Sequence, residues 1–192
     1  LSQYYGAKDF ENLRKSLAHS YRLTAFIAAG VLILSQSFAS LVLTGLHTPS
    51  NIIGMSLLYL RIIFCGIPAT AAYNMFASAL RAMGNSKTPL TAMIIASVLN
   101  VSLDILFVAG FGWGVAGAAI ATVIAQSFSA VYCFLILRRI DIVHLTRADF
   151  MPASGMNARL MKLGIPVVFQ NIIIGVGGLV VQYVINGYGS FL

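Results

Sequence analysis

The chain has 192 residues, of which 59% are hydrophobic and only 9% are charged. A soluble domain carries about a quarter charged residues because its surface must be solvated, so this composition excludes most soluble classes and predicts that the chain meets lipid. The net charge of +7 would suggest nucleic acid in a soluble protein, but the basic residues lie between long apolar stretches, and no nucleic-acid partner is expected. The two cysteines, Cys65 and Cys133, have no disulfide or zinc spacing and are predicted to be small core residues.

Five stretches are long and apolar enough to cross a bilayer, which needs roughly 20 residues of helix. The fold class is therefore predicted to be an all-α membrane protein with about five transmembrane helices. The second stretch carries Arg61 and should bend at Gly66-Ile67-Pro68, and the third begins with Pro89 and contains Asp104. A polar linker, predicted to be a loop or an interfacial helix, covers residues 138–162. The predicted spans are 23–46, 52–80, 88–108, 115–137 and 163–185, with turns at 47–51 and 110–114.

The basic residues fix the orientation of these spans. Alternating the connections between the two sides places eleven of the twelve Lys and Arg residues on one side and none on the other, the exception being Arg61 within a span. Because cytoplasmic loops are rich in Lys and Arg, the N-terminal segment, the 81–87 turn and the linker are predicted to be cytoplasmic. The chain starts without Met and stops soon after the fifth span, so we expect both ends to be cuts in a longer protein.

Asp104 is the one acidic residue within a predicted span, and an ionisable group there is a candidate functional site. Asn100 and Ser97 lie on the same helical face. Counting outward from the turn near Gly112 predicts that Asp104 is level with Thr122. The same count puts Asn100 level with Gln126, one turn deeper. One carboxylate with amide and hydroxyl oxygens suits a hard cation, and a buried carboxyl suits a proton carrier; the alternative is a polar contact between helices.

The remaining features point to packing or to a cavity. Small residues in the fourth and fifth spans are typical of close helix contacts. In the fifth span, Gln170 and Asn171 are predicted either to line a cavity or to form hydrogen bonds between helices. The three histidines lie at span ends or in loops, and no catalytic motif is present, so the chain is not expected to be an enzyme.

Three segments carry a family resemblance: 80–89 (LRAMGNSKTP), 100–104 (NVSLD) and 114–122 (GVAGAAIAT). Together with the opening QYYGAK at 3–8, they resemble the MATE multidrug and toxin extrusion transporters, of prokaryotic type. The resemblance implies a twelve-helix protein of two bundles, of which this chain supplies helices three to seven. Residues 1–137 would be four spans of the N-terminal bundle, 138–162 the cytoplasmic linker between bundles, and 163–192 the first helix of the C-terminal bundle.

The resemblance also implies a function. Such transporters exchange external protons or sodium ions for cytoplasmic cationic amphipathic compounds. Asn100, Asp104 and Thr122 match the positions of the family's cation site in the N-terminal bundle, and would be the sodium ligands if sodium is used. Gln126 is included in the predicted site because it is expected to be level with Asn100. An acidic residue of the first helix, which usually completes that site, lies outside this sequence. The Glu that one subgroup carries in the seventh helix is also absent, because the chain is apolar around Ile174.

The resemblance further implies a multi-pass protein of the inner membrane, monomeric at full length, whose partners are small-molecule drugs or toxins and the bilayer. It needs no cofactor other than the coupling ion. The rival interpretation is a flippase for lipid-linked saccharides or a related exporter, whose cavity tends to be cationic, a role open here only to Arg61. A membrane anchor or scaffold is the third possibility, but in such a protein Asp104 would have no functional role.

Overall fold

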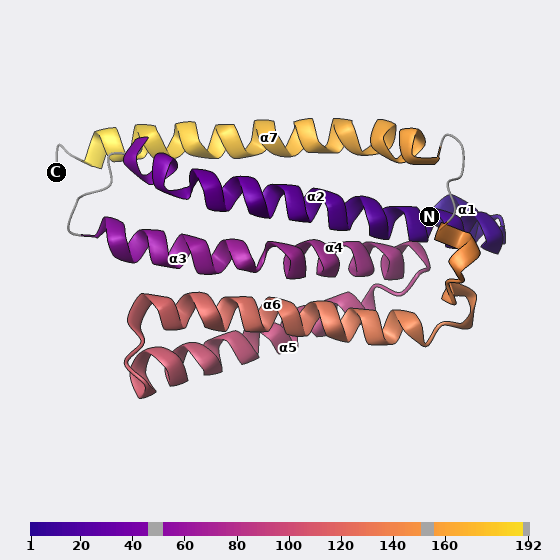
Figure 1. The fold of residues 1–192 in the computed structure, drawn as a ribbon, viewed down its shortest axis with the longest axis horizontal. Helices are drawn as coiled ribbons and strands as arrows, with labels where there is room; N and C mark the ends of the chain where they lie inside the picture. Colours follow the sequence, from indigo (N-terminus) through magenta and orange to yellow (C-terminus); the bar gives the residue numbers. More distant parts are fainter. Residues whose placement is uncertain (46–51, 151–155, 190–192) are drawn as a thin grey trace. The chain divides into compact units, whose positions relative to one another are not determined.

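A computed structural model describes residues 1–45, 52–150 and 156–189. The predicted turn at 47–51 lies outside the described residues. The chain divides into two compact units, Leu1–Met151 and Pro152–Leu192, and each is described by itself. All regular structure in the described part of the chain is helical (Figure 1).

The first unit contains the first four predicted spans. After the short helix α1 (Ser2–Gly6), its long helices are α2 (Phe10–Gly45), α3 (Ile53–Cys65), α4 (Ile67–Ala82), α5 (Lys87–Asp104) and α6 (Gly114–Arg138). A π-helix, η1 (Ile105–Gly110), extends α5, and two single 3-10 turns, η2 (Asp141–Val143) and η3 (Arg147–Phe150), follow α6. The second unit contains α7 (Met156–Gly189).

Five helical segments are long and apolar enough to cross a membrane: Phe10–Gly45, Ile53–Ala82, Lys87–Gly110, Gly114–Arg138 and Leu160–Gly178. The predicted all-α fold with five transmembrane helices is therefore confirmed. Many apolar side chains face outward from the first unit. Phe26 and Ile33 of α2, for example, are 72% and 65% exposed. Such surface suits lipid or further helices rather than water.

The helix α2 begins thirteen residues before the predicted start of its span. The charges at Arg14, Lys15 and Arg22 predict the later start, but a charge limits the membrane-embedded part of a helix and not the helix itself. The first turn of the helix is capped by Asp9, whose Oδ1 accepts a hydrogen bond from the backbone N–H of Asn12 at 3.1 Å. A carboxylate in this position satisfies one of the unpaired N–H groups of the first turn.

The second predicted span is broken at the expected place. α3 ends at Cys65 and α4 begins at Ile67, with Gly66 between them. The N–H of Gly66 donates to the carbonyl of Ile63 at 2.9 Å, which is the tighter 3-10 spacing. Pro68, in the first turn of α4, has no N–H to continue the α-helical ladder. The predicted bend is therefore confirmed.

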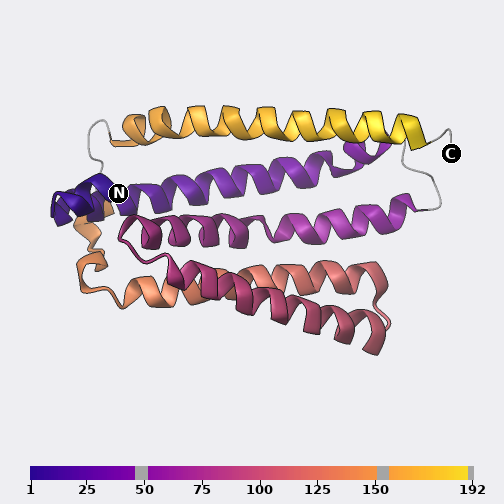
Figure 2. The ribbon, with the colours of Figure 1, turned by 180° about the vertical axis from the view of Figure 1, so that it is seen from behind.

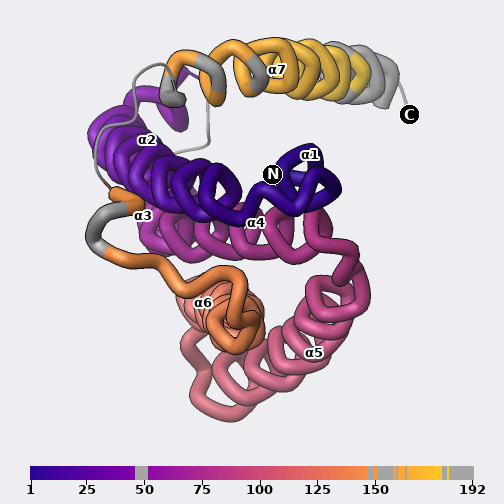
Figure 3. Tube along the Cα trace, turned by 90° about the vertical axis from the view of Figure 1, so that its right-hand side faces the viewer, coloured from indigo at the N-terminus to yellow at the C-terminus, as the bar shows by residue number. Residues whose placement is uncertain are grey.

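The helix α6 packs against α3, α4, α5 and η1, and α3 and α4 lie between α6 and α2 (Figures 1 and 2). The view along the helices shows α5 and α2 at opposite edges of the unit (Figure 3). Small residues let α6 take this position, since Gly117, Ala119, Ala121 and Ala125 are all buried. Their predicted packing role is confirmed.

The apolar core lies at the end of the unit that is predicted to be cytoplasmic. Leu17 of α2, Leu80 of α4 and Leu137 of α6 are each at most 2% exposed, and Cys133 is fully buried among them. Cys133 is thus a small core residue, as predicted. Cys65 is not, because it is the last residue of α3 at the break and is exposed.

The first part of the predicted linker is attached to α2 by an ion pair and a hydrogen bond. Asp149 of η3 is 5% exposed, and its Oδ1 lies 3.8 Å from Nε of Arg14. Its Oδ2 accepts hydrogen bonds from the N–H and the hydroxyl of Thr146 at 2.7 and 2.8 Å. Arg22 Nη1 donates to the carbonyl of Phe150 at 3.1 Å. The last part of the predicted linker, from Met156, is already the start of α7.

Candidate functional site

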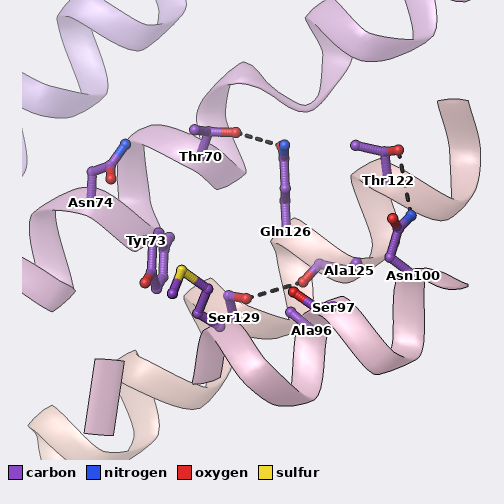
Figure 4. Close-up of a pocket in the computed structure, with 11 residues that line it drawn as sticks. Thr70, Tyr73, Asn74, Ala96, Ser97, Asn100, Thr122, Ala125, Gln126 and Ser129 are labelled. Atoms are coloured by element: carbon purple, nitrogen blue, oxygen red, sulfur yellow. Dashed lines mark hydrogen bonds between the residues drawn. The ribbon is translucent and has the colours of Figure 1, made fainter. Parts of the chain in front are cut away.

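A pocket of about 320 Å³ opens between α4, α5 and α6 within the predicted membrane-spanning region (Figure 4). Its lining mixes hydroxyl and amide side chains with small apolar ones. The lining residues are Thr70, Tyr73 and Asn74 of α4, Met93, Ala96, Ser97 and Asn100 of α5, and Thr122, Ala125, Gln126 and Ser129 of α6. Polar groups at this position need partners or water, since lipid offers them none.

Asn100 and Thr122 form the contact between α5 and α6 at one end of the pocket. Asn100 Nδ2 lies 3.5 Å from Thr122 Oγ1, at the outer limit of a hydrogen bond. The Thr122 hydroxyl donates its own proton to the carbonyl of Ala118 at 3.0 Å. Thr122 is therefore the acceptor in the contact with Asn100, because a hydroxyl carries a single proton.

Gln126 faces α4 rather than Asn100. Its Oε1 accepts a hydrogen bond from the hydroxyl of Thr70 at 2.5 Å. The same hydroxyl lies 3.2 Å from the carbonyl oxygen of Gly66, in the helix break. A Cβ added at Gly66 would lie 3.0 Å from Val123 Cγ2 and 3.3 Å from Gln126 Oε1. α6 thus approaches the break more closely than any residue larger than glycine would allow without rearrangement.

The other end of the pocket contains longer polar contacts. Ser129 Oγ of α6 lies 3.2 Å from the carbonyl oxygen of Ala125 on its own helix and 3.5 Å from that of Ala92 on α5, and its single proton can be donated to either of them. The Tyr73 hydroxyl of α4 donates to the carbonyl of Pro89 on α5 at 3.3 Å. Polar side chains therefore link all three helices around the cavity.

Asp104 is the last residue of α5, one turn beyond Asn100, and is not among the residues that line the pocket. Its Oδ1 is buried and has no hydrogen-bond partner among the described residues. A buried carboxylate oxygen without a donor costs free energy, which a proton or a cation would offset. The described residues contain no group of three His, Cys, Asp or Glu side chains that could hold a metal.

The predicted layers are offset by one turn. Asn100, not Asp104, is level with Thr122, and Gln126 pairs with Thr70. The cause is the π-helix between Asp104 and the turn, where the N–H of Phe111 bonds the carbonyl of Leu106 at 2.9 Å, five residues back. A π-helix holds more residues in each turn than an α-helix. The count at the α-helical rise therefore placed Asp104 too deep.

Gln170 and Asn171 lie on α7, in the second unit, and both are exposed within it. Asn171 Nδ2 donates to the carbonyl of Val167 on its own helix at 3.0 Å. Their role as cavity-lining residues stays a prediction.

Two pocket residues of α4, Thr70 and Asn74, were missed by the sequence analysis. They lie four residues apart and so share one face of the helix. A pair of polar residues at that spacing, directly after a proline break in an apolar span, is a signal that could have found them.

Comparison with known proteins gives the chain its family. The sequence profile of the MatE family matches residues 1–106, more than half of the chain. A probable multidrug resistance protein of Bacillus subtilis, YpnP, is 33% identical over 190 residues, which cover 99% of this chain and 42% of the relative. The multidrug export protein MepA of Staphylococcus saprophyticus is 26% identical and is covered to 43%. The chain thus spans about two fifths of the length of these relatives.

A solved structure has the same fold. The outward-facing conformation of a multidrug resistance MATE family transporter of the MOP superfamily matches 91% of this chain with a TM-score of 0.83. The match covers 39% of that transporter at 22% identity. The fold is that of a multi-pass membrane transporter, and the chain belongs to the MATE family. The expectation of a transporter rather than an enzyme is confirmed by this membership.

Proposed function

We propose that this chain is part of a secondary active multidrug exporter of the cytoplasmic (inner) membrane. The exporter exchanges external protons or sodium ions for cytoplasmic cationic amphipathic compounds. The observation that carries the proposal is the polar pocket between α4, α5 and α6, with the unpartnered carboxylate oxygen of Asp104 one turn away on α5. The names of the relatives, which are multidrug resistance and multidrug export proteins, support the same function.

In this proposal the coupling ion binds at Asp104, with oxygens of Asn100, Thr122 and Gln126 as further ligands. An empty, ionised Asp104 favours a conformation that keeps water near it, because burial of a bare charge is costly. A proton or a sodium ion removes that cost and permits a drier packing. The ion then changes the affinity for the drug, because both ligands shift the same conformational equilibrium. By thermodynamic reciprocity, the drug must change the binding free energy of the ion by the same amount.

The chemistry of the pocket favours this function over a saccharide flippase. A flippase that binds the phosphates of lipid-linked saccharides needs cationic groups in its cavity. The described residues that line the pocket include no Lys, Arg or His. Neutral oxygens and aromatic or apolar surface, such as that of Tyr73 and Met93, suit a cationic amphipathic molecule better.

The test uses the full-length transporter in a host that lacks its own efflux pumps. Cells should accumulate less ethidium when the transporter is expressed, and dissipating the proton or the sodium gradient should restore accumulation. The ionophore that restores it identifies the coupling ion. Accumulation that is insensitive to both ionophores, or export of lipid-linked saccharide without export of ethidium, would contradict the proposal.

A further inference from the structure

Both halves of the broken span pack against α2 and α6, but the hydrogen bonds described next join α3 to α2 and α4 to α6. On α3, the carbonyl of Arg61 accepts a hydrogen bond from Gln36 Nε2 of α2 at 2.9 Å. Gln36 Nε2 also lies 3.4 Å from Cys65 Sγ at the end of α3. On α4, the Thr70 hydroxyl bonds Gln126 of α6. A change in the angle at Gly66 moves α3 relative to α4 and so acts on these two hydrogen bonds.

The attachment on α4 leads directly to the candidate cation site. Gln126 lies four residues after Thr122, on the same face of α6. Thr122 in turn contacts Asn100. Two hydrogen-bonded pairs, Asn100 with Thr122 and Gln126 with Thr70, therefore lie one helical turn apart along α6, between Asn100 and the helix break.

The Thr70 hydroxyl has two acceptors and only one proton. Gln126 Oε1 lies at 2.5 Å and the carbonyl oxygen of Gly66 at 3.2 Å. A bond to Gln126 ties α4 to α6, whereas a bond to Gly66 ties α4 only to its own first turn. The choice between these acceptors therefore decides whether Thr70 links α4 to α6 by a hydrogen bond.

The break itself offers little resistance to bending. Pro68 removes one backbone hydrogen bond, and the 3-10 spacing at Gly66 replaces another. The Gly66 carbonyl already accepts the N–H of Thr70 at 3.0 Å, and its second lone pair can take the hydroxyl proton. Releasing the contact with Gln126 thus leaves no orphaned donor on Thr70.

We propose that Thr70 is a positioning residue that makes the bend between α3 and α4 depend on the occupancy of the cation site. The inference rests on the proposed function, in which Gln126 supplies an oxygen to the coupling ion. When the ion draws Gln126 Oε1 to itself, Thr70 loses its acceptor on α6 and donates to Gly66 instead. The hydrogen bond between α4 and α6 next to the break is then lost, and the bend at Gly66 changes. Ion binding and the bend of this span are coupled through a single hydroxyl.

The test compares three variants of the full-length transporter in nanodiscs. Thr70→Val removes the hydroxyl and keeps the shape, and Thr70→Ser keeps the hydroxyl. Thr91→Val is the matched control, because the Thr91 hydroxyl of α5 bonds the carbonyl of Lys87 on its own helix at 3.0 Å. Spin labels at Leu58 of α3 and Ser78 of α4, in a background without Cys65 and Cys133, report the bend. Ethidium binding, with and without the coupling ion, reports the coupling.

In the wild type and in the Thr70→Ser and Thr91→Val variants, the ion should change the distance between the labels. It should also change the Kd for ethidium by about 5- to 150-fold, a typical range for coupled sites. In Thr70→Val the ion should leave the distance unchanged and alter the Kd less than about 2-fold. If that variant does not fold, Thr70→Ala should show the same loss.

A distance change and a Kd ratio that survive Thr70→Val or Thr70→Ala at the wild-type level would overturn the role of Thr70 alone. Loss of both in Thr91→Val as well would also overturn it, because the effect would then belong to any helix threonine. A wild type in which the ion changes neither quantity would contradict the proposed function itself.

Discussion

Asn100 of α5 and Thr122 of α6 meet where these two helices pack together, with Asn100 Nδ2 3.5 Å from Thr122 Oγ1. The contact is long, and both groups are neutral. It therefore contributes little to stability, at most about 1 kcal/mol. What it does is hold two oxygen-bearing side chains one turn from the carboxylate of Asp104.

This arrangement predicts a graded effect of substitutions at the site. Asn100→Ala and Thr122→Ala each remove one oxygen ligand and no charge, so each should weaken the apparent affinity for the coupling ion while efflux persists. We expect a roughly 10-fold lower apparent affinity for the ion, which corresponds to the loss of about 1.4 kcal/mol of binding free energy. The measurement is the ion concentration that gives half-maximal ethidium efflux. An unchanged value in both variants would exclude these side chains from the site.

The contact between Gly66 and α6 predicts a steric effect. Gly66→Ala should lower stability by about 1 to 3 kcal/mol, because the new methyl group would lie 3.0 Å from both Val123 Cγ2 and the carbonyl oxygen of Ile63. Gly30→Ala in α2 is the control, since a Cβ there meets nothing within 4 Å. That change should be neutral or stabilising by about 0.5 to 1 kcal/mol. Thermal unfolding in detergent would measure both, and equal effects would contradict the close approach.

The orientation derived from the basic residues predicts which turns face the cytoplasm. A cysteine at His144, which is exposed between η2 and η3, should react with an impermeant maleimide only when the cytoplasmic face is open to it. A cysteine at Phe111, in the turn before α6, should react in intact cells. Labelling of His144→Cys in intact cells, with Phe111→Cys protected, would reverse the topology.

The attachment of the linker to α2 predicts a defined response to pH. Burial of Asp149 raises the pKa of its carboxyl, but the hydrogen bonds from Thr146 and the charge of Arg14 outweigh burial and hold that pKa below its ordinary value of 3.8. A group with a lowered pKa in the folded state stabilises fully above its ordinary pKa, and loses the effect as the pH falls through the lowered value. The attachment should therefore be unchanged between pH 7.5 and 5.5.

Asp149→Asn should loosen the same attachment at neutral pH. Hydrogen bonds to a charged group contribute about 1.5 to 3 kcal/mol, so amide exchange in residues 141–150 should accelerate by roughly 10- to 100-fold. Hydrogen exchange with mass spectrometry would measure this. Faster exchange in the wild type at pH 5.5 than at pH 7.5, after correction for intrinsic rates, would contradict the lowered pKa of Asp149.

Composition and span length were sufficient to predict the fold of the described residues, because the bilayer restricts a long apolar segment to a helix. The break at Gly66 was also predictable, since Pro68 removes a backbone donor wherever it lies in a helix. The start of α2 was not, because the charges at Arg14 and Arg22 mark the membrane boundary and leave the helix free to continue beyond it.

The sequence predicted that Asn100, Thr122 and Gln126 come together but not how they pair, and their role in binding an ion stays a prediction. Asn100, Thr122 and Gln126 do line one pocket, because short turns force neighbouring spans to pack together. Their pairing depends on the π-helix after Asp104, and no residue in Ile105–Gly110 signals it. The partner of Gln126, Thr70, comes from a helix whose rotation relative to α6 is set by the close approach at Gly66, which a pattern of residue types does not contain.

Asp104→Asn in the full-length transporter tests the central claim most directly. The amide is nearly isosteric and cheaper to bury than a carboxylate, so folding and insertion should be retained. Without the charge, the site can neither hold a proton nor balance a cation. Efflux of ethidium driven by the ion gradient should therefore be abolished, while ethidium still binds and its Kd no longer responds to the ion. Wild-type efflux by this variant, with an unchanged response to the gradient, would show that Asp104 is structural and that coupling lies elsewhere.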